Sequence, residues 1–341
     1  MKVLIFVVSI LSSGLILSDD SVLSRSGHVK AFNEAQSCFN SVANTRGVIK
    51  IDCAKRALEE GRFIFEPGSL NIAALTYNYG KALRQRDYKK SYHILGESLE
   101  LYEVIYGKSS LELINILIDM GEWRKVKDIA KKHFEKDSVE YADVLLKLAM
   151  SNMLSSKDTR RHADLALEIY LEEEGIESIN SATASFQVGK VRFAQQKYKS
   201  AIPYLMGATK HPEVATYAHG WLVRAYGLTD QDELASYHAE QLGRSREGVE
   251  GNYVPVFIPS PDYPRRAQRL GVEGYAVVEL TISQQGHATR IELVEEWPES
   301  YDFGEEALQA AERLLYAPRF IDGVAQEVTG VLYKYQFKMA R

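Results

Sequence analysis

The chain has 341 residues, of which 45% are hydrophobic and 26% charged, and its formal net charge is -5. This length exceeds what one compact core usually takes, so we expect two or more domains of ordinary globular composition. Basic residues are scattered along the sequence and form no stripe, which argues against a nucleic-acid partner.

Residues 1–18 have the layout of a secretory signal. Lys2 gives a positive start, an apolar run extends from Val3 to Leu17, and the small Ser18 precedes two aspartates. The run is shorter than the about 20 apolar residues that a membrane-spanning helix needs. We therefore expect export with residues 1–18 as a signal peptide. The alternative is an uncleaved signal that anchors the protein in the inner membrane.

Residues 19–68 are expected to form a helical hairpin, with helices at about 29–42 and 48–65. Cys38 and Cys53 stand nearly equidistant from the connecting turn, so antiparallel helices would bring them level. In an oxidising compartment this position favours a disulfide, and two buried thiols are the alternative. The spacing is far from Cys-x-x-Cys, so we expect no redox-active pair.

From residue 69 to 244 the apolar residues recur at three and four positions, which is the helical period. The segment also resembles itself, in the order aromatic, small, aliphatic, small residue. Two clear copies are Tyr88, Ser91, Leu95, Ser98 and Tyr198, Ala201, Leu205, Ala208. Degraded copies are Trp123 with Val126 and Ala130, Ala166 with Tyr170, and Ala235 with Ala239.

This pattern resembles the second helix of a tetratricopeptide repeat, in which small side chains let helices approach closely. Gly189 falls where that family has its first-helix glycine. We expect a solenoid of four or five helix pairs, with the patterned aromatic residues in its core. Its concave surface could bind peptides or other proteins; a rigid spacer for the last domain is an equal alternative.

Residues 245–258 are interpreted as a linker, because glycines and prolines interrupt any helix there. A short helix is then expected from Pro264 to Leu270. An alternating strand follows from Tyr275 to Ser283, and Gly286 supplies the positive φ of a tight turn.

The rest of the chain continues this pattern with a strand, a helix and a strand. The second strand runs from His287 to Glu295, with Ile291 and Leu293 facing inward. One face of the helix is formed by Phe303, Ala307, Ala310, Ala311 and Leu314. The last strand alternates Val331, Tyr333, Tyr335 and Phe337 with Leu332, Lys334, Gln336 and Lys338. We expect the helix to cover one face of a three-stranded sheet.

Element order and residues together resemble the TonB C-terminal domain over residues 259–339. The residues that carry the resemblance are Pro261, Tyr263, Pro264, Ala267, Gly271, Glu273, Gly274, Gly286, Phe303, Ala310, Ala311, Tyr316, Pro318, Gly323 and Phe337. None is specific alone, but the ordered set is. The expected fold class is α+β multidomain: an all-α helical-repeat solenoid, then a small α-β-β-α-β domain over residues 259–341.

The resemblance implies a periplasmic protein that binds a short extended peptide, the TonB box, of an outer-membrane transporter. The peptide adds as a strand beside the final strand, whose unpaired N–H and C=O groups supply most of the attraction. The implied contact residues are Tyr263, Pro264, Val331, Leu332, Tyr333, Lys334, Tyr335, Gln336 and Phe337. Alternatively, Tyr263 and Pro264 simply start the first helix, and Lys334, Gln336 and Lys338 form a solvated face that discourages pairing.

The sequence also departs from the family. Ser260 stands where a transporter-contacting glutamine is expected, three residues before Tyr263. Val3 to Leu17 contains no histidine that could couple to the ExbB–ExbD proton channel, and helical repeats replace the proline-rich periplasm-spanning stretch. We expect energy transduction, if this chain takes part in it, to need another protein at the membrane end.

No catalytic or metal-binding pattern emerges from the sequence. The eight histidines are scattered without paired-ligand spacing, and there is no Gly-x-Ser-x-Gly elbow. The glutamates near residues 295–306 flank a helix start, where acids suit the helix dipole. We expect no enzyme, cofactor or metal site.

Two functions are therefore expected. In the first, the C-terminal domain engages TonB boxes or TonB-complex subunits while the repeats recruit another protein. In the second, the protein is a cell-envelope scaffold whose repeats do the binding, without a direct part in energy transduction. An open sheet edge can also pair two copies of the chain as a homodimer.

Overall fold

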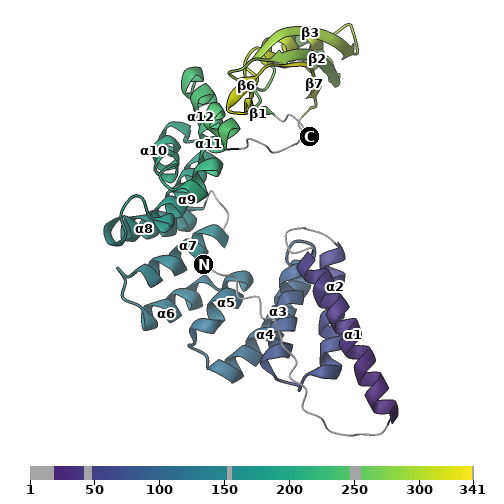
Figure 1. Cartoon of the computed structure of the whole chain (residues 1–341), viewed down its shortest axis with the longest axis vertical. Coiled ribbons are helices and arrows are strands. Elements are labelled where there is room, and N and C mark those ends of the chain that lie inside the picture. The colour runs from purple at the N-terminus through teal and green to yellow at the C-terminus, as the bar shows by residue number, and fades with distance from the viewer. Residues whose placement is uncertain (1–18, 42–47, 152–155, 246–254, 340–341) are drawn as a thin grey trace. The chain divides into compact units, whose positions relative to one another are not determined.

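The computed structural model describes residues 19–41, 48–151, 156–245 and 255–339, so the predicted signal lies outside the described residues. The chain forms two compact units, residues 1–133 and 134–341. A long helical region is followed by a small β-sheet domain, as predicted (Figure 1). Among the described helices, none combines the length and apolar character needed to cross a bilayer.

The first unit begins with the predicted helical hairpin. Its helices are α1 (Asp19–Ser41) and α2 (Val48–Ile64), so the first helix starts earlier than expected. Cys38 and Cys53 form the predicted disulfide, with their Cα atoms 5.8 Å apart. Phe32 and Leu58 are buried where α1 and α2 pack together, which gives the hairpin a small apolar core.

Helices in the rest of the first unit form two further pairs. They are α3 (Leu70–Leu83), α4 (Tyr88–Tyr106), the short 3-10 helix η1 (Leu111–Leu113), α5 (Ile114–Met120) and α6 (Trp123–His133). Gly80 lets α3 approach α4 closely, because a Cβ there would lie 2.9 Å from the Leu95 side chain. Ser91 Oγ donates to the Gly80 carbonyl at 2.7 Å. Two small residues thus allow the close packing of this pair.

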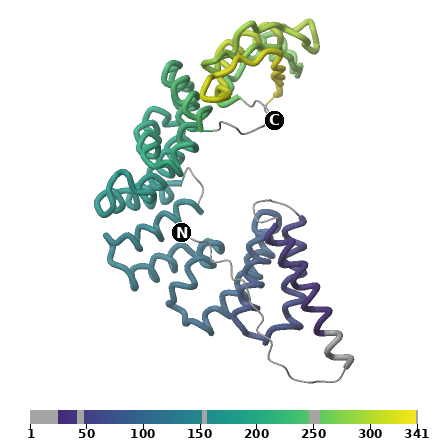
Figure 2. The backbone as a smooth tube through the Cα atoms, viewed as in Figure 1, coloured from purple at the N-terminus to yellow at the C-terminus, as the bar shows by residue number. Residues whose placement is uncertain are grey.

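The second unit opens with three helix pairs, which follow one another along the chain in Figure 2. The helices are α7 (Val139–Ser151), α8 (Lys157–Glu173), α9 (Ile179–Ala194), α10 (Tyr198–Ala208), α11 (Pro212–Gly227) and α12 (Asp232–Arg244). A Cβ at Gly189 would lie 2.6 Å from Leu205 Cδ2, which repeats the contact of Gly80 with Leu95. Ala201 and Ala208 are fully buried. The predicted self-similarity is therefore a repeated packing contact.

A recurring serine cap starts the first helix of several pairs. The hydroxyls of Ser69, Ser138 and Ser178 accept hydrogen bonds from backbone N–H groups of α3, α7 and α9, at 3.4, 3.2 and 3.0 Å. Such caps satisfy N–H groups that have no partner inside the helix. Between residues 70 and 244 the described helices form five consecutive pairs, consistent with the predicted helical repeat.

The patterned aromatic residues differ in burial: Tyr170 is fully buried as predicted, whereas the aromatic residues that start the pattern are less buried than predicted. Tyr88 is 59% exposed and is the first residue of α4; its ring centroid lies 6.3 Å from that of Tyr92. Tyr198 and Trp123 are half-buried. By contrast, Val126, Ala130, Ala166 and Ala239 are fully buried. The small and aliphatic positions of the pattern form the core, and the aromatic position lies at its margin.

The C-terminal domain has the predicted three-stranded sheet, with the order β3–β2–β7. Its elements are α13 (Arg265–Leu270), β2 (Gly274–Ile282), β3 (Ala288–Trp297), α14 (Phe303–Ala311) and β7 (Val328–Phe337). The inward face of β2 is closed to solvent at Ala276, Val278, Leu280 and Ile282. The predicted apolar face of α14 packs against β2 and β3, and Phe303 and Ala307 there are fully buried.

Two details around α14 refine the predicted pattern. Leu293 lies on the side of α14, next to Gly304, yet it remains 41% exposed because β3 is an edge strand. Leu293 therefore points toward α14, as predicted, but it is not buried. Glu296 accepts a hydrogen bond from the Gly304 N–H at 2.5 Å, so one of the clustered glutamates caps this helix.

Four short strands were not predicted. They are β1 (Pro255–Phe257), β4 (Leu315–Tyr316), β5 (Arg319–Ile321) and β6 (Val324–Gln326). β1 lies in the segment interpreted as a linker, but pairs with β4; residues 246–254 lie outside the described residues. Strands of two or three residues are too short to show an alternating pattern, and β1 is stabilised by contacts from distant parts of the sequence.

The second unit has a continuous core from its last helix pair to β1 and β4. Phe257 and Leu315 are buried in one cluster with Leu222 of α11. The Phe257 ring lies so close to Gly227 that a Cβ there would be 2.8 Å from it. Arg313 donates to the Gly227 carbonyl at 3.0 Å and also to Asp230 and Asp232. Apolar packing, together with the hydrogen bonds and ion pairs of Arg313, thus attaches the β-sheet domain to α11 and α12.

Candidate peptide-binding edge

Strand β7 lies at one edge of the sheet and has β2 as its one neighbour there. The two strands are antiparallel and stay in register from Gly274 opposite Phe337 to Leu280 opposite Val331. In such a pair, alternate residues turn their N–H and C=O groups toward the neighbour and away from it. Within the described residues, no other helix or strand packs extensively along the outer side of β7. Its outward N–H and C=O groups can therefore accept a further strand.

A β-bulge separates this regular stretch from the start of β7. Leu280 pairs with Val331 but Ile282 pairs with Val328, so β7 contains one extra residue at this point. Gly330 has a φ of 72°, a conformation that glycine adopts without strain. The bulge interrupts the ladder just before Val331. The uninterrupted register therefore coincides with the segment that the sequence predicted as the receiving strand.

Side chains of β7 alternate between the two faces of the sheet. Tyr335 and Phe337 are 4% and 3% exposed and belong to the core that α14 covers. Leu332 is 60% exposed, and Lys334 and Gln336 are also exposed on the opposite, open face. A strand added beside β7 would alternate in the same way. Its side chains would lie next to the tyrosines on one face and next to Leu332 and Lys334 on the other.

Tyr263 and Pro264 are held by contacts inside the domain. The Tyr263 ring meets Phe303 and Phe337 edge-to-face, with centroids 6.0 and 5.8 Å apart. Its hydroxyl donates to the Val272 carbonyl at 2.8 Å, and Pro264 is buried. Burial raises the pKa of Tyr263, with a further contribution from Glu273. Tyr263 thus packs beneath the carboxyl end of β7, and these contacts support its role in directing the chain into α13.

Three side chains form a stack across the open face of the sheet. Lys334 Nζ lies 3.4 Å from the centroid of the Tyr275 ring, and Tyr275 stacks on Trp297 at 6.4 Å. The Tyr275 hydroxyl donates to Glu295 at 2.5 Å, and this hydrogen bond raises the pKa of Tyr275. The sequence alone does not reveal this stack, because only the register shows that residues of β3, β2 and β7 are neighbours.

The buried side of β7 carries a cluster of tyrosines. Tyr333 and Tyr335 meet at 4.8 Å, and burial raises the pKa of both. Burial also raises the pKa of Tyr316 to about 12. The Tyr335 hydroxyl is buried and has no hydrogen-bond partner among the described residues. Since buried polar groups are normally paired, this hydroxyl is an unusual feature of the edge strand.

Residues 259–339 match the family described as Gram-negative bacterial TonB protein C-terminal. The solution NMR structure of the Pseudomonas aeruginosa TonB CTD is similar at 29% identity, with coverage of 28% of this chain and 94% of that chain and a TM-score of 0.23. No curated protein matches the chain. The family match indicates a role in TonB-dependent transport, in which TonB C-terminal domains interact with outer-membrane transporters. The match to the TonB C-terminal family thus covers residues 259–339, and the helical repeats before this segment lie outside it.

Proposed function

We propose that this chain is a non-catalytic periplasmic protein that binds extended peptides, the TonB boxes of outer-membrane transporters, by strand addition to β7. The observation that carries the proposal is the edge position of β7. Its register with β2 is unbroken from Val331 to Phe337, and its outer side has no strand beside it within the described residues.

Strand addition fits the physical character of this edge. The outward N–H and C=O groups of β7 supply directional hydrogen bonds to any extended chain, which gives attraction without sequence preference. Selectivity then comes from side chains beside the edge, namely Tyr333 on the covered face and Leu332, Lys334 and Gln336 on the open face. We expect apolar peptide positions beside Leu332, and few basic positions beside Lys334 because like charges repel.

The test is hydrogen–deuterium exchange of the full chain with a panel of TonB-box heptapeptides. Bound peptide should slow the exchange of residues 331–337 and leave β3, residues 288–297, unchanged. Slower exchange at β3, or no change at β7 with any peptide of the panel at saturation, would exclude this mode of binding.

A matched pair of N-methylated peptides separates backbone recognition from side-chain recognition. Methylation of alternate residues removes either the N–H groups that face β7 or those that face solvent. One member of the pair should lose affinity more than about tenfold, and the other should bind nearly as well as the parent peptide. Equal affinity for both members would mean that the backbone does not form the predicted ladder.

Two further measurements bear on location and self-association. We expect cell fractionation to place the protein in the periplasm, with the mature N-terminus near residue 19 if the signal is cleaved. If two copies pair through β7 instead of binding a peptide, exchange at residues 331–337 should slow as the concentration of the protein alone rises.

A further inference from the structure

Aromatic and basic side chains share one face of α9 and α11. On α9 they are Phe186, Lys190 and Phe193, and on α11 they are Tyr217, Trp221 and Arg224. Both sets have the spacing i, i+4, i+7, which places each set on a single side of its helix. We refer to these six residues as the aromatic–basic strip.

The rings of the strip contact one another between the two helices. Phe186 lies 6.4 Å from Tyr217 and 6.3 Å from Trp221, and Phe193 meets Trp221 edge-to-face at 5.0 Å. Tyr217 is 67% exposed, and the other three rings are half-buried. Packing therefore fixes the position of aromatic surface that is still open to solvent. Such preorganised aromatic surface is typical of binding sites on proteins.

The two cations of the strip contact rings and no carboxylates. Lys190 Nζ lies 5.4 Å from the Phe186 centroid, and the Arg224 guanidinium lies 5.5 Å from Phe193 and 5.7 Å from Trp221. Neither cation forms an ion pair with any residue that the structure describes. Arg192, also on α9, differs: it pairs with Asp164 at 3.1 Å.

The absence of a carboxylate partner matters most for Lys190, because this residue is partly buried. Burial lowers the pKa of Lys190, which means that the protein has removed part of the water around this ammonium group. A partly desolvated cation gains most from an anion that forms a charge-assisted hydrogen bond. The strip thus combines fixed aromatic surface with cations that have room for an acidic partner.

We propose that the aromatic–basic strip is a docking surface for a peptide segment of a partner protein that carries Asp or Glu next to aromatic or aliphatic residues. The carboxylate would pair with Lys190 or Arg224, and the apolar side chain would pack on Tyr217 and Trp221. This site is separate from β7 and does not depend on strand addition there. A nucleic acid fits less well, because the strip offers only two cations and the chain has a net charge of -5.

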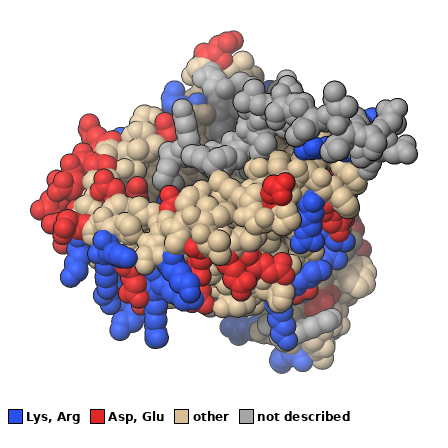
Figure 3. All heavy atoms as spheres, turned by 90° about the horizontal axis from the view of Figure 1, so that it is seen from below, with Lys and Arg blue, Asp and Glu red and all other residues tan. Residues whose placement is uncertain are grey.

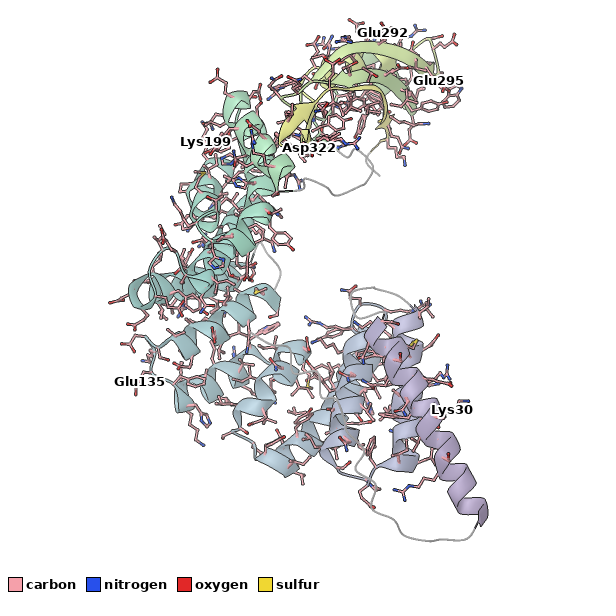
Figure 4. The ribbon with its side chains drawn as sticks, in the orientation of Figure 1. Lys30, Glu135, Lys199, Glu292, Glu295 and Asp322 are labelled. Atoms are coloured by element: carbon pink, nitrogen blue, oxygen red, sulfur yellow. A yellow bond between two sulfur atoms is a disulfide. The ribbon has the colours of Figure 1, made fainter. Side chains whose placement is uncertain are left out.

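The test selects peptides with the full chain from a displayed library of random dodecapeptides. We expect the selected sequences to be enriched in Asp or Glu beside aromatic or aliphatic residues. The double variant Lys190→Ser with Arg224→Ser should weaken their binding at least about tenfold. The matched control is Lys197→Ser with Lys199→Ser, which removes two exposed lysines of which Lys199 lies on α10 (Figure 4). It should leave the affinity unchanged.

Changes in the peptide make the result independent of how well the variants fold. Replacing Asp and Glu of a selected peptide by Asn and Gln should cause the same loss with the unmodified chain, and higher salt should reduce the difference. The proposal is overturned if no peptide is selected, if the selected peptides lack acidic residues, or if both double variants bind them equally. Peptides that slow exchange at residues 331–337 bind the other site and would also count against it.

Discussion

The two edge strands of the C-terminal sheet differ although both pair with β2. β3 shifts its register twice against β2, once between Val277 and Val278 and once between Glu279 and Thr281. Arg290, within β3, has a φ of 48°. β7 has one shift, at its start, and is regular from there to its end. One edge of the same sheet is thus irregular and the other is straight over its last residues.

Charge adds to this difference. β3 carries Glu292 and Glu295, which Figure 4 labels on this strand, and both are exposed. Bulges and charged side chains are the usual means by which proteins keep an edge strand from pairing with other chains. β7 has such a bulge only before Val331, and of its exposed side chains only Lys334 is charged. The β3 edge thus carries two register shifts and exposed charges that oppose pairing with another chain, whereas the β7 edge has few such features after Val331.

The charges on one face of the molecule bear on the choice of partner. On the face that Figure 3 shows, acidic and basic side chains lie side by side with uncharged surface between them. Among the described side chains of this face no continuous basic stripe is visible, and such a stripe is the usual feature of a surface that binds a polyanion. The charge distribution on this face is compatible with the peptide partners proposed above.

The largest expected effect comes from the ends of the two edge strands. Phe337 ends β7 and is 3% exposed, whereas Trp297 ends β3 and is 59% exposed. Phe337→Ala should lower the free energy of unfolding of the domain by about 3–5 kcal/mol, because it leaves a cavity beside Tyr263 and Phe303. Trp297→Ala should cost about 1 kcal/mol or less. Hydrogen exchange of the β2 amides in the full chain measures both. Equal costs would mean that β7 is no better anchored than β3.

The next effect concerns α11 and α12, the helix pair that contacts the β-sheet domain. His238 is 2% exposed, its Nδ1 lies 2.8 Å from His219 Nδ1, and its ring stacks on Tyr226. Burial, and then the nearby His219, lowers the pKa of His238 from 6.5 to about 4. The unfolded chain therefore binds a proton more readily, and stability should fall by about 2–3 kcal/mol as the pH falls from 6.5 to 4.

Urea unfolding of the full chain at pH 7 and pH 4.5 tests this dependence, with His238→Gln as the comparison. The variant should lose most of the difference between the two pH values. If it keeps the whole difference, another group is responsible. Lowering the pH should also speed hydrogen exchange in α11 and α12. If the regularity of β7 comes from the sheet itself, hydrogen exchange at β7 should remain slower than at β3 under the same conditions.

A smaller effect tests the bulge that precedes the regular stretch. Gly330 has a φ of 72°, and a Cβ there would meet open space. Gly330→Ala should therefore cost only the strain of the left-handed backbone, about 1–2 kcal/mol, and Gly330→Asn should cost less. Thr329→Ala, at the exposed neighbouring residue, is the control and should change stability by less than about 0.5 kcal/mol. If the two substitutions at Gly330 lower the free energy of unfolding equally, backbone strain is not the cause of the loss.

The sequence predicted β2 and β7 well because their apolar residues alternate along most of each strand, although Thr281, predicted to point outward, is 5% exposed and therefore buried. Gly274 to Leu280 and Val331 to Phe337 keep one register with each other, so a period of two is enough to assign their faces. It predicted the close-packed repeats for a similar reason, since Gly189 and Leu205 meet within one helix pair.

The rest depends on contacts that no local pattern records. The irregular register of β3 depends on the backbone at Arg290, a residue that rarely takes a positive φ. β1 forms because β4 and α11 lie beside it, and both are distant in sequence. The stack of Trp297, Tyr275 and Lys334, and the strip on α9 and α11, likewise become visible only when the elements are assembled.

The smallest effect addresses how β7 recognises a peptide. Tyr335→Phe removes a buried hydroxyl that has no hydrogen-bond partner among the described residues and keeps the ring in the core. The free energy of unfolding should stay constant or rise by about 1 kcal/mol, because the folded protein no longer buries an unpaired hydroxyl. Tyr301→Phe, at a half-buried position outside β7, is the control. Peptide affinity should be unchanged, since the outward N–H and C=O groups of β7 stay the same. If Tyr335→Phe weakens binding without changing stability, the hydroxyl must reach the added strand. β7 would then recognise peptides through a side chain of its covered face as well as through its backbone, a contact for which β3 has no counterpart.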